Sequence, residues 1–266
     1  MPNLNVITWN STGETAQGAA DLQAVIVYMA SQGLPPDVIV VQEAGAAPGG
    51  AIYQMLAGLG NAYNQPPAHA TEGGGPGGRG YLLITRVPIA GQATFGRYDL
   101  GNDAGLVAWI NASLSLPARG IAANELAAMR MPAIASLSAG TVSMPFLTWH
   151  VPLGPGQVLG WRLARGANPD AFLFLQNSQM YQTLVGPGLN NLGIIAGDLN
   201  VPVAELNNAT GDPRLPRLLP DWVGVSDDLD HILGHPNAPQ PDPAFSNAGH
   251  FPATGQHDIL VSTVSW

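Results

Sequence analysis

The chain has 266 residues, of which 46% are hydrophobic, so it is long enough to bury a sizeable core and is not expected to be disordered. It contains no cysteine, which excludes disulfide bonds, thiolate zinc sites and a cysteine nucleophile. The formal net charge is −9, and all nine basic residues are arginine. Because duplex DNA binding depends on basic side chains that neutralise phosphates, we expect non-specific DNA affinity to be modest and strongly salt-dependent.

Short apolar runs recur along the chain, and each is bounded by a polar or turn residue. Their length and their frequent valine and isoleucine favour β-strands over helices. Several runs are apolar at successive positions, which suits strands that are buried on both faces. The predicted strands are residues 4–8, 38–41, 81–85, 106–110, 145–148, 192–196, 232–233 and 259–264.

Helical patterns lie between these strands, and glycine or proline ends several of them. The predicted helices are residues 18–31, 51–59 and 169–185, with a further helical patch at 121–131. The loops at 73–80 and 236–243 are rich in glycine or proline but too short to separate domains, so we expect one domain over residues 1–266. The glycine-rich loop is not a phosphate-binding loop, since no lysine follows it.

Polar side chains that can support catalysis stand at the edges of six predicted strands. Strand ends in α/β proteins are favoured positions for sites, because a rigid scaffold meets solvent there. Together these side chains supply the oxygen and imidazole groups that metal-assisted phosphoryl hydrolysis needs. They are Asn10, Glu43, His150, Asp198, Asn200, Asp230 and His257.

The oxygen donors in this set suit a hard metal ion. Mg²⁺ takes oxygen ligands and often only one or two protein carboxylates, and Glu43 is the first candidate. Asp198 and Asn200 stand two residues apart after a glycine, so both can point into one site from a loop just past a strand.

The histidines supply groups for proton transfer. Histidine titrates near neutral pH, so His150 and His257 can serve as acid, base or neutral donor. A carboxylate beside His257 would fix its tautomer and raise its basicity, and Asp230 is the natural supplier.

Each of these residues also has an ordinary structural interpretation when taken alone. Glu43 can be a surface acid after a strand, and Asp198 and Asn200 can be turn formers. Their shared placement at strand ends carries the functional interpretation. Outside this pattern, we expect surface roles for His69, His235 and His250, a His231 that faces the other side of its strand, and packing roles for Trp109, Trp161, Trp222 and Trp266.

Short motifs around the strand-end residues occur in the order seen in the endonuclease/exonuclease/phosphatase superfamily. The chain resembles this superfamily from about residue 4 to residue 264. The stretch Val41-Gln42-Glu43-Ala44-Gly45 and the step Met131-Pro132-Ala133 are most similar to the cytolethal distending toxin B subunit, a deoxyribonuclease I-like toxin component. The other motifs are Thr8-Trp9-Asn10, Thr148-Trp149-His150, Gly197-Asp198-Leu199-Asn200, Leu229-Asp230-His231-Ile232-Leu233 and Gln256-His257.

The resemblance implies an α/β fold, a four-layer sandwich of two central mixed β-sheets flanked by helices. It also implies in-line attack of water on phosphorus without a covalent enzyme intermediate. His257 would activate the water with Asp230 as its partner, and His150 would steady or protonate the leaving oxygen. Asn10 and Arg130 would bind the substrate phosphate. Mg²⁺, for which Mn²⁺ or Ca²⁺ can substitute, would be held by Glu43, Asp198, Asn200 and Gln256, of which Asp198 and Asn200 also position the nucleophile.

Three departures from the family pattern affect these expectations. Gln256 stands where the family usually has an aspartate, so metal binding should be weaker or the rate lower. Related nucleases often carry a carboxylate near the strand that holds Tyr81, whereas this chain has Arg79 there and Glu72 as the nearest acid. The toxin-type arginine is displaced by one position, to Arg130.

The sequence thus predicts an Mg²⁺-dependent phosphoric ester hydrolase, and three functions are weighed. The local motifs favour a deoxyribonuclease I-like endonuclease that hydrolyses DNA phosphodiesters. The net charge of −9 favours instead a phosphatase or phospholipase that acts on phosphoinositides or another small phosphoester. The third is a non-catalytic binding protein that keeps the fold, and only Gln256 supports it.

Partners and location are less constrained. We expect DNA or a small phosphoester as the substrate, and we expect the chain to be a monomer. The resemblance to the toxin subunit also allows toxin-type partner subunits. No apolar run approaches the ~20 residues of a transmembrane helix, and residues 1–5 lack the charged start and apolar stretch of a signal peptide. A toxin-type protein would be secreted, and otherwise a cytoplasmic location is expected.

Overall fold

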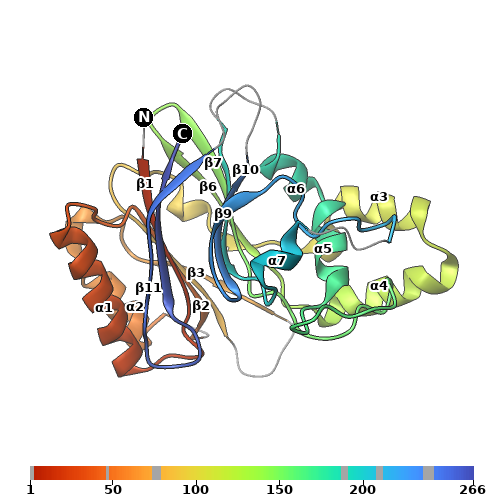
Figure 1. Cartoon of the computed structure of the whole chain (residues 1–266), viewed down its shortest axis with the longest axis horizontal. Helices are drawn as coiled ribbons and strands as arrows, with labels where there is room; N and C mark the ends of the chain where they lie inside the picture. Colours follow the sequence, from red (N-terminus) through yellow and green to blue (C-terminus); the bar gives the residue numbers. More distant parts are fainter. Residues whose placement is uncertain (1–2, 46–47, 74–78, 187–190, 208–211, 236–242) are drawn as a thin grey trace.

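The computed structural model describes residues 3–45, 48–73, 79–186, 191–207, 212–235 and 243–266. Within these ranges, two β-sheets of six strands each face one another, with helices on both outer sides (Figure 1). The predicted four-layer α/β sandwich with two mixed sheets is therefore confirmed. None of the helices in the described part of the chain is long and apolar enough to cross a membrane.

The first sheet holds the strands from both ends of the chain. Its order is β11 (Ala244–Phe251), β12 (Ile259–Ser265), β1 (Asn3–Asn10), β2 (Val38–Ala44), β4 (Gly80–Thr85) and β3 (Ala68–Thr71). β1 runs parallel to β2 and antiparallel to β12. The C-terminal ends of β1 and β2 and the N-terminal end of β12 therefore lie together at one end of the strands. The chain termini lie side by side at the opposite end (Figure 1).

The second sheet repeats this arrangement. Its order is β5 (Gly96–Arg97), β6 (Ala133–Ala139), β7 (Val142–Thr148), β8 (Gly193–Asp198), β10 (Asp230–His235) and β9 (Val223–Asp227). β7 runs parallel to β8, and β10 runs antiparallel to β8 with Asp230 opposite Asp198. The C-terminal ends of β7 and β8 and the N-terminal end of β10 therefore also lie together at one end of the strands.

Apolar side chains fill three layers of core. One layer lies between the two sheets. The second packs the first sheet against α1 (Ala16–Ser31) and α2 (Ala51–Ala57). The third packs the second sheet against the remaining long helices, namely α3 (Ala104–Ser113), α4 (Leu116–Ala128), α5 (Pro169–Gln176) and α6 (Gln179–Leu184). Because both sheet faces are covered, every residue of β2 is buried, which explains the successive apolar positions in its sequence.

Four short helices complete the described elements. They are α7 (Val203–Leu206), η1 (Gly60–Ala62), η2 (Gln92–Thr94) and η3 (Leu100–Asn102).

The predicted strand at residues 106–110 is wrong, because these residues lie in helix α3. The side chain of Asp103 accepts a hydrogen bond from the backbone N–H of Leu106 at 2.7 Å and so begins the helix. Only one side of the helix packs inward: Leu106 is fully buried, whereas Val107 is 40% exposed. An apolar run of this length does not distinguish a strand from a helical segment, and the capping residue stands outside the run.

The other predicted strands and helices are confirmed, with shifted ends. Residues 169–185 form two helices, since the Ser178 hydroxyl accepts a hydrogen bond from Tyr181 N–H at 3.1 Å and begins α6. The helical patch at 121–131 lies largely in α4, which ends at Ala128. Most of the two predicted loops, residues 74–78 and 236–242, falls outside the described residues.

Two buried carboxyl groups hold the loop that follows β7. Glu125 of α4 accepts a hydrogen bond from Gln157 N–H at 3.1 Å. Asp170 of α5 accepts from Val158 N–H at 2.6 Å and from Leu159 N–H at 3.0 Å. Burial, together with the neighbouring Asp170, raises the pKa of Glu125 to about 8. Glu125 is therefore neutral near pH 7, which avoids two adjacent buried charges.

Replacing Glu125 by glutamine should stabilise the protein at alkaline pH. The pKa of Glu125 rises from 4.5 to about 8 on folding, so the unfolded chain alone releases the proton between these values and stability falls as pH rises. E125Q keeps the acceptor for Gln157 but has no proton to lose. Its melting temperature should exceed that of the wild type at about pH 8 and match it at about pH 5.

The half-buried Glu205 of α7 provides the control, because E205Q should leave this pH dependence unchanged. Equal destabilisation of E125Q at both pH values would contradict the account.

Candidate active site

The six strand ends described above meet where the two sheets face each other, and a cavity of about 480 Å³ opens there. Every predicted site residue except Asp230 lines it, and Asp230 lies buried behind His257. The structure therefore brings together residues that are up to 247 positions apart in the sequence (10 to 257). The lining residues are Asn10, Thr12, Glu43, Arg79, Arg130, His150, Leu153, Asp198, Asn200, Gln256 and His257.

His257 and Asp230 form a hydrogen-bonded pair. The Nδ1 atom of His257 lies 2.7 Å from Oδ2 of Asp230, and its Nε2 atom lies 3.6 Å from Oδ2 of Asp198. Burial by itself would lower the pKa of His257, but the hydrogen bond and charge of Asp230 outweigh it and raise the pKa. Asp230 thus fixes the ring so that Nδ1 donates to it and Nε2 faces Asp198.

Asp198 stands at the end of β8 between the two candidate catalytic histidines. Its Oδ2 atom accepts a hydrogen bond from Asn10 Nδ2 at 2.9 Å and lies 3.7 Å from His150 Nε2. Its Oδ1 atom accepts from the backbone N–H of Asn200 at 2.9 Å. Asn10 belongs to the first sheet and Asp198 to the second, so this carboxylate joins the two sheets at the cavity.

Local backbone irregularities aim two of the side chains. Glu43 lies in β2 where its register with β4 shifts between Val41 and Ala44, and it has a φ of 53°. Asn200 has a φ of 54°, and its Nδ2 atom donates to the Val151 carbonyl at 2.7 Å. A bulge redirects side chains out of the strand alternation, and positive φ values are costly for residues other than glycine. Both features are common at functional sites.

Glu43 is surrounded by positive or potentially positive groups. Its carboxylate forms an ion pair with Arg79, and Oε1 lies 3.3 Å from Arg130 Nη1 and 3.0 Å from His150 Nδ1. Burial by itself would raise the pKa of Glu43, but hydrogen bonds from His150 and Arg79 outweigh it and lower the pKa to about 2. Glu43 is therefore a carboxylate at every physiological pH, as a metal ligand must be.

Glu72 is part of the same cluster, although the sequence pointed to it only as the nearest acid. It is 3% exposed, and its Oε1 atom accepts from Glu43 N–H at 3.1 Å and lies 4.0 Å from His150 Nδ1. Its Oε2 atom lies 3.8 Å from Arg130 Nε. The pairing of Thr71 with Gly80 brings Glu72 beside the site. Strand β3 has only four residues, Ala-His-Ala-Thr, and gave no continuous apolar run in the sequence.

Arg130 lies in the cavity despite its displacement by one position in the sequence. Its Nη1 atom lies 2.8 Å from Nε2 of His150, and its carbonyl accepts from Trp149 Nε1 at 2.9 Å. The guanidinium thus lies beside His150 and within ion-pair distance of the carboxylates of Glu43 and Glu72. This position suits contact with an anionic substrate.

The donor set around the cavity fits a hard divalent ion. Ligand atoms of Asp198, Asp230 and His257 lie within 4.8 Å of one another. Asp230 Oδ1 is a buried oxygen without a hydrogen-bond partner in the described structure, but it lies behind His257 and outside the cavity lining, so Asp198 is the carboxylate of this group that can reach an ion in the cavity. Glu43 adds a second cavity-lining carboxylate, and Gln256 adds only a neutral amide.

The histidines outside the predicted pattern stay outside the cavity. His231 faces away, bonded to Ser226 Oγ at 2.6 Å and to the Val201 carbonyl at 2.7 Å, as predicted. His250 is exposed, whereas His69 and His235 are half-buried, so the expected surface roles hold only for His250. The packing roles of the four tryptophans are confirmed, because Trp109, Trp161, Trp222 and Trp266 all pack against the core.

Comparison with known proteins agrees with this architecture. The family model described as "Endonuclease/Exonuclease/phosphatase family" matches residues 7–252. Gln256 and His257 lie beyond the matched residues, and it is the fold that places them in the cavity. A search of curated proteins found no match.

Solved structures of similar fold span the whole chain. The structure of TDP2 from D. rerio complexed with a single-strand DNA product has a TM-score of 0.61 at 14% identity, with 100% of each chain covered. A family protein from Bacteroides vulgatus has a TM-score of 0.57 at 11% identity, covering 100% of this chain and 99% of its own. Sphingomyelinase C from Streptomyces griseocarneus has a TM-score of 0.52 at 14% identity, with 100% of each chain covered.

At these identities the structural likeness establishes the fold, and the family model establishes the relationship. Members of this family are generally phosphoester hydrolases, which agrees with a cavity of carboxylates and histidines at the strand ends. This chain belongs to the endonuclease/exonuclease/phosphatase family.

Proposed function

We propose that the protein is an Mg²⁺-dependent phosphodiesterase, with DNA as its first candidate substrate. The observation that carries the proposal is the His257–Asp230 pair, whose Nε2 atom faces Asp198 in the cavity that also holds Glu43 and His150. A carboxylate-supported imidazole beside metal-binding oxygens is the arrangement that water attack on a phosphoester requires.

In this mechanism His257 accepts a proton from the attacking water at Nε2. Asp230 holds the ring through Nδ1 and stabilises the imidazolium that forms, because its carboxylate is 2.7 Å away. His150, on the other side of Asp198, steadies or protonates the leaving oxygen. Arg130 and Asn10 face the cavity and bind the non-bridging phosphate oxygens.

The ion would be held by Glu43, Asp198, Asn200 and Gln256, which all line the cavity. When bound, Mg²⁺ would neutralise the phosphoryl oxygens and make the phosphorus more open to attack. Asn200 has its amide nitrogen engaged by the Val151 carbonyl at 2.7 Å, so its amide oxygen is the atom available to the site. Mn²⁺ or Ca²⁺ can substitute if oxygen ligands dominate.

A phosphatase or phospholipase acting on phosphoinositides or another small phosphoester is the second candidate. The net charge of −9 supports it, because an acidic chain gains little binding free energy from the negatively charged phosphates of DNA. Among proteins of similar fold, TDP2 from D. rerio is complexed with a single-strand DNA product and another is a sphingomyelinase, so fold similarity supports both candidates. The likeness to the toxin B subunit, the monomeric state and any toxin-type partners stay predictions.

The substrate is tested by a parallel assay of Mg²⁺-dependent plasmid nicking at low salt and phosphate release from inositol lipids. We expect cleavage of DNA that is lost on chelation with EDTA. Phosphate release from lipids without any DNA cleavage would transfer the assignment to the second candidate. Absence of hydrolysis on both substrates would favour a non-catalytic binding protein.

H257A and H150A should each lower the turnover rate by at least ~10²-fold, the lower range of what a positioned acid or base contributes. H250A is the matched control, because His250 is an exposed histidine that also contacts carboxylates, Asp227 and Asp258, but lies outside the cavity. Its rate should stay within about twofold of the wild type. An H257A variant as active as H250A would remove the activity from this cavity.

Q256D should tighten Mg²⁺ binding. Gln256 lines the cavity but supplies no negative charge, and a carboxylate is the stronger ligand for a hard cation. We expect a decrease of roughly tenfold in the Mg²⁺ dissociation constant, equivalent to about 1.4 kcal/mol, by isothermal titration calorimetry. Unchanged affinity would place the ion away from residue 256.

R79Q should also tighten Mg²⁺ binding, because Arg79 is paired with the candidate metal ligand Glu43. A metal ion must displace this guanidinium from the carboxylate, and its removal ends the competition. The same titration should show an affinity several-fold higher than that of R165Q, whose arginine pairs with the exposed Asp228 outside the cavity. Weaker Mg²⁺ binding in R79Q would contradict the competition.

A further inference from the structure

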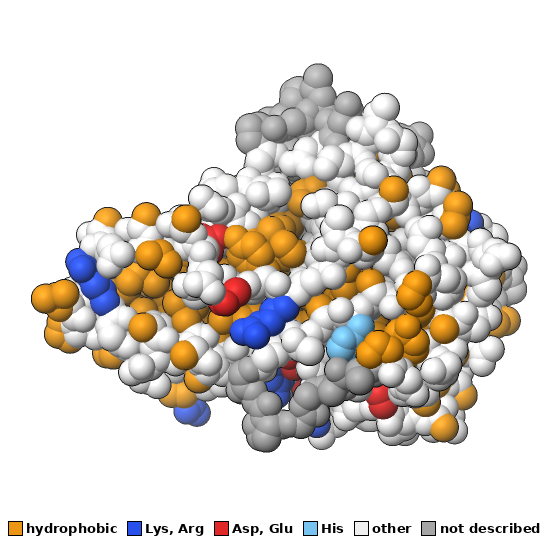
Figure 2. All heavy atoms as spheres, turned by 180° about the vertical axis from the view of Figure 1, so that it is seen from behind, with side chains coloured by type: hydrophobic (Ala, Val, Ile, Leu, Met, Phe, Trp, Pro, Cys, Tyr) orange, Lys and Arg blue, Asp and Glu red, His pale blue; other side chains and the backbone are white. Residues whose placement is uncertain are grey.

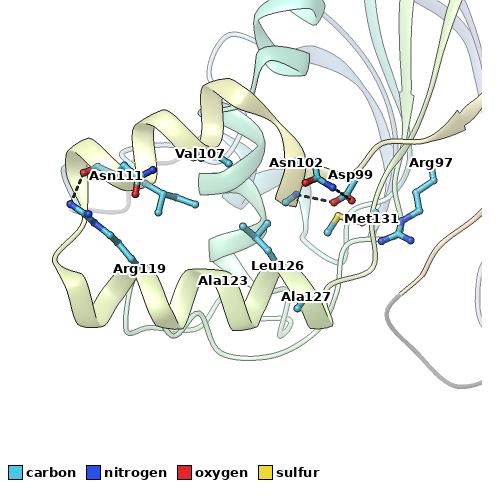
Figure 3. A pocket seen from close by; sticks show the side chains of 12 residues that line it. Arg97, Asp99, Asn102, Val107, Asn111, Arg119, Ala123, Leu126, Ala127 and Met131 are labelled. Carbon is cyan, nitrogen blue, oxygen red and sulfur yellow. Dashed lines mark hydrogen bonds between the residues drawn. The ribbon is translucent and has the colours of Figure 1, made fainter.

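A second cavity lies between α3 and α4, and no residue that lines it belongs to the candidate active site. The two helices lie side by side and are joined by residues 114–115, so their facing sides form a groove (Figure 3). Its volume of about 480 Å³ falls within the range of small-molecule sites. The mechanism proposed above makes no use of it.

The floor of this groove is apolar. Val107 and Ile110 come from α3, Leu126 from α4, and Met131 from the segment that follows, while Ala123 and Ala127 leave room between them. Residues 104–128 contain only two charged side chains, and one of these, Glu125, is buried. Figure 2 shows hydrophobic side chains gathered over this end of the molecule, on the face opposite to that of Figure 1. Such a floor favours an alkyl chain over a polar ligand.

An arginine stands at each end of the groove, Arg119 beside Asn111 at one end and Arg97 at the other (Figure 3). Within the described part of the chain, neither forms an ion pair with a carboxylate. This is unusual here, because most arginines of this acidic protein are paired. The paired ones are Arg79, Arg86, Arg130, Arg165, Arg214 and Arg217.

The two arginines differ in what they can offer a ligand. Arg119 donates to the Leu114 carbonyl at 3.0 Å and to the Asn111 carbonyl at 2.5 Å, so it closes its end of the groove. Arg97 is exposed, and its guanidinium lies beside Gly73. The described structure gives this side chain no hydrogen-bond partner, although the backbone of Arg97 pairs with Ala133 in the sheet. The lining acid Asp99 bonds within its own turn, to Gly101 N–H at 3.0 Å and Asn102 Nδ2 at 2.7 Å. Arg97 is therefore the free cation for an anionic head group.

We propose that this groove binds a single-chain anionic amphiphile, with the alkyl chain on the apolar floor and the anionic head at Arg97. The chemistry is shared by free fatty acids and by alkyl or lysophospholipid phosphates. A neutral alkyl ligand would leave Arg97 unused, and a short anion would leave the floor exposed to water. The inference does not depend on the substrate hydrolysed at the candidate active site.

The test is isothermal titration calorimetry of the full chain with octyl, decyl and dodecyl phosphate below their critical micelle concentrations. Affinity should rise with chain length, by at most about fourfold for each buried methylene. Dodecanoate in place of dodecyl phosphate distinguishes the two sources of the anion, and decanol should bind at least ~10-fold more weakly than decyl phosphate. A flat chain-length series, or equal binding of decanol, would overturn the proposal.

Variants place the binding in this groove. R97Q should weaken dodecyl phosphate binding by about tenfold or more, whereas R162Q should not, because Arg162 is also exposed and unpaired in the described structure but lies outside the groove. A123W should block the groove, and its melting temperature is measured first. R97Q changes only an exposed side chain and should fold normally. If A123W fails to fold, the comparison of dodecyl phosphate binding by R97Q and R162Q therefore tests the proposal.

Light scattering separates the remaining alternative. A dimer in the wild type that A123W disrupts would show that a second copy of the chain covers the groove, and this would overturn the proposal. Equal binding by R97Q and R162Q would do the same.

Discussion

The site depends on the interactions that the buried carboxylate of Asp198 makes with its neighbours. It is 1% exposed, and burying a charge is costly unless hydrogen bonds and opposite charges surround it. Asn10 from the first sheet, the backbone of Asn200 and the rings of His150 and His257 provide that surrounding. The two sheets must therefore pack against each other in one relative position for Asp198 to make its hydrogen bonds. The same packing assembles the cavity.

Around Glu43, buried negative charge is likewise compensated by neighbouring basic side chains. Two buried acids, Glu43 and Glu72, share one cluster with Arg79, Arg130 and His150. The cations hold the pKa of Glu43 near 2 although burial opposes ionisation. A chain with a net charge of −9 thus gathers positive charge around its candidate metal ligand. This arrangement suits a site in which Glu43 exchanges a guanidinium partner for a metal cation when the cation enters.

Continuous apolar runs located most of the buried strands, and the polar residues that follow these strands are easily found in the sequence. The four-layer fold itself was implied by the resemblance of the motifs to the family. The sequence did not predict α3, since the apolar run at residues 106–110 looks the same in a strand and a helix and the cap Asp103 lies outside it. It also missed that Glu72 belongs to the cluster around Glu43. That contact depends on the pairing of β3 with β4, a long-range feature that leaves no local pattern.

The groove between α3 and α4 followed from structure alone, because it depends on which faces of two helices meet. Whether water attacks phosphorus in a single step, without a covalent enzyme intermediate, is tested most directly by stereochemistry. A chiral phosphorothioate diester that the protein cleaves in ¹⁸O-labelled water in the presence of Mg²⁺ should yield an isotopically chiral product with inverted configuration at phosphorus. Retention of configuration would reveal a covalent enzyme intermediate and contradict a single in-line attack by water activated at His257.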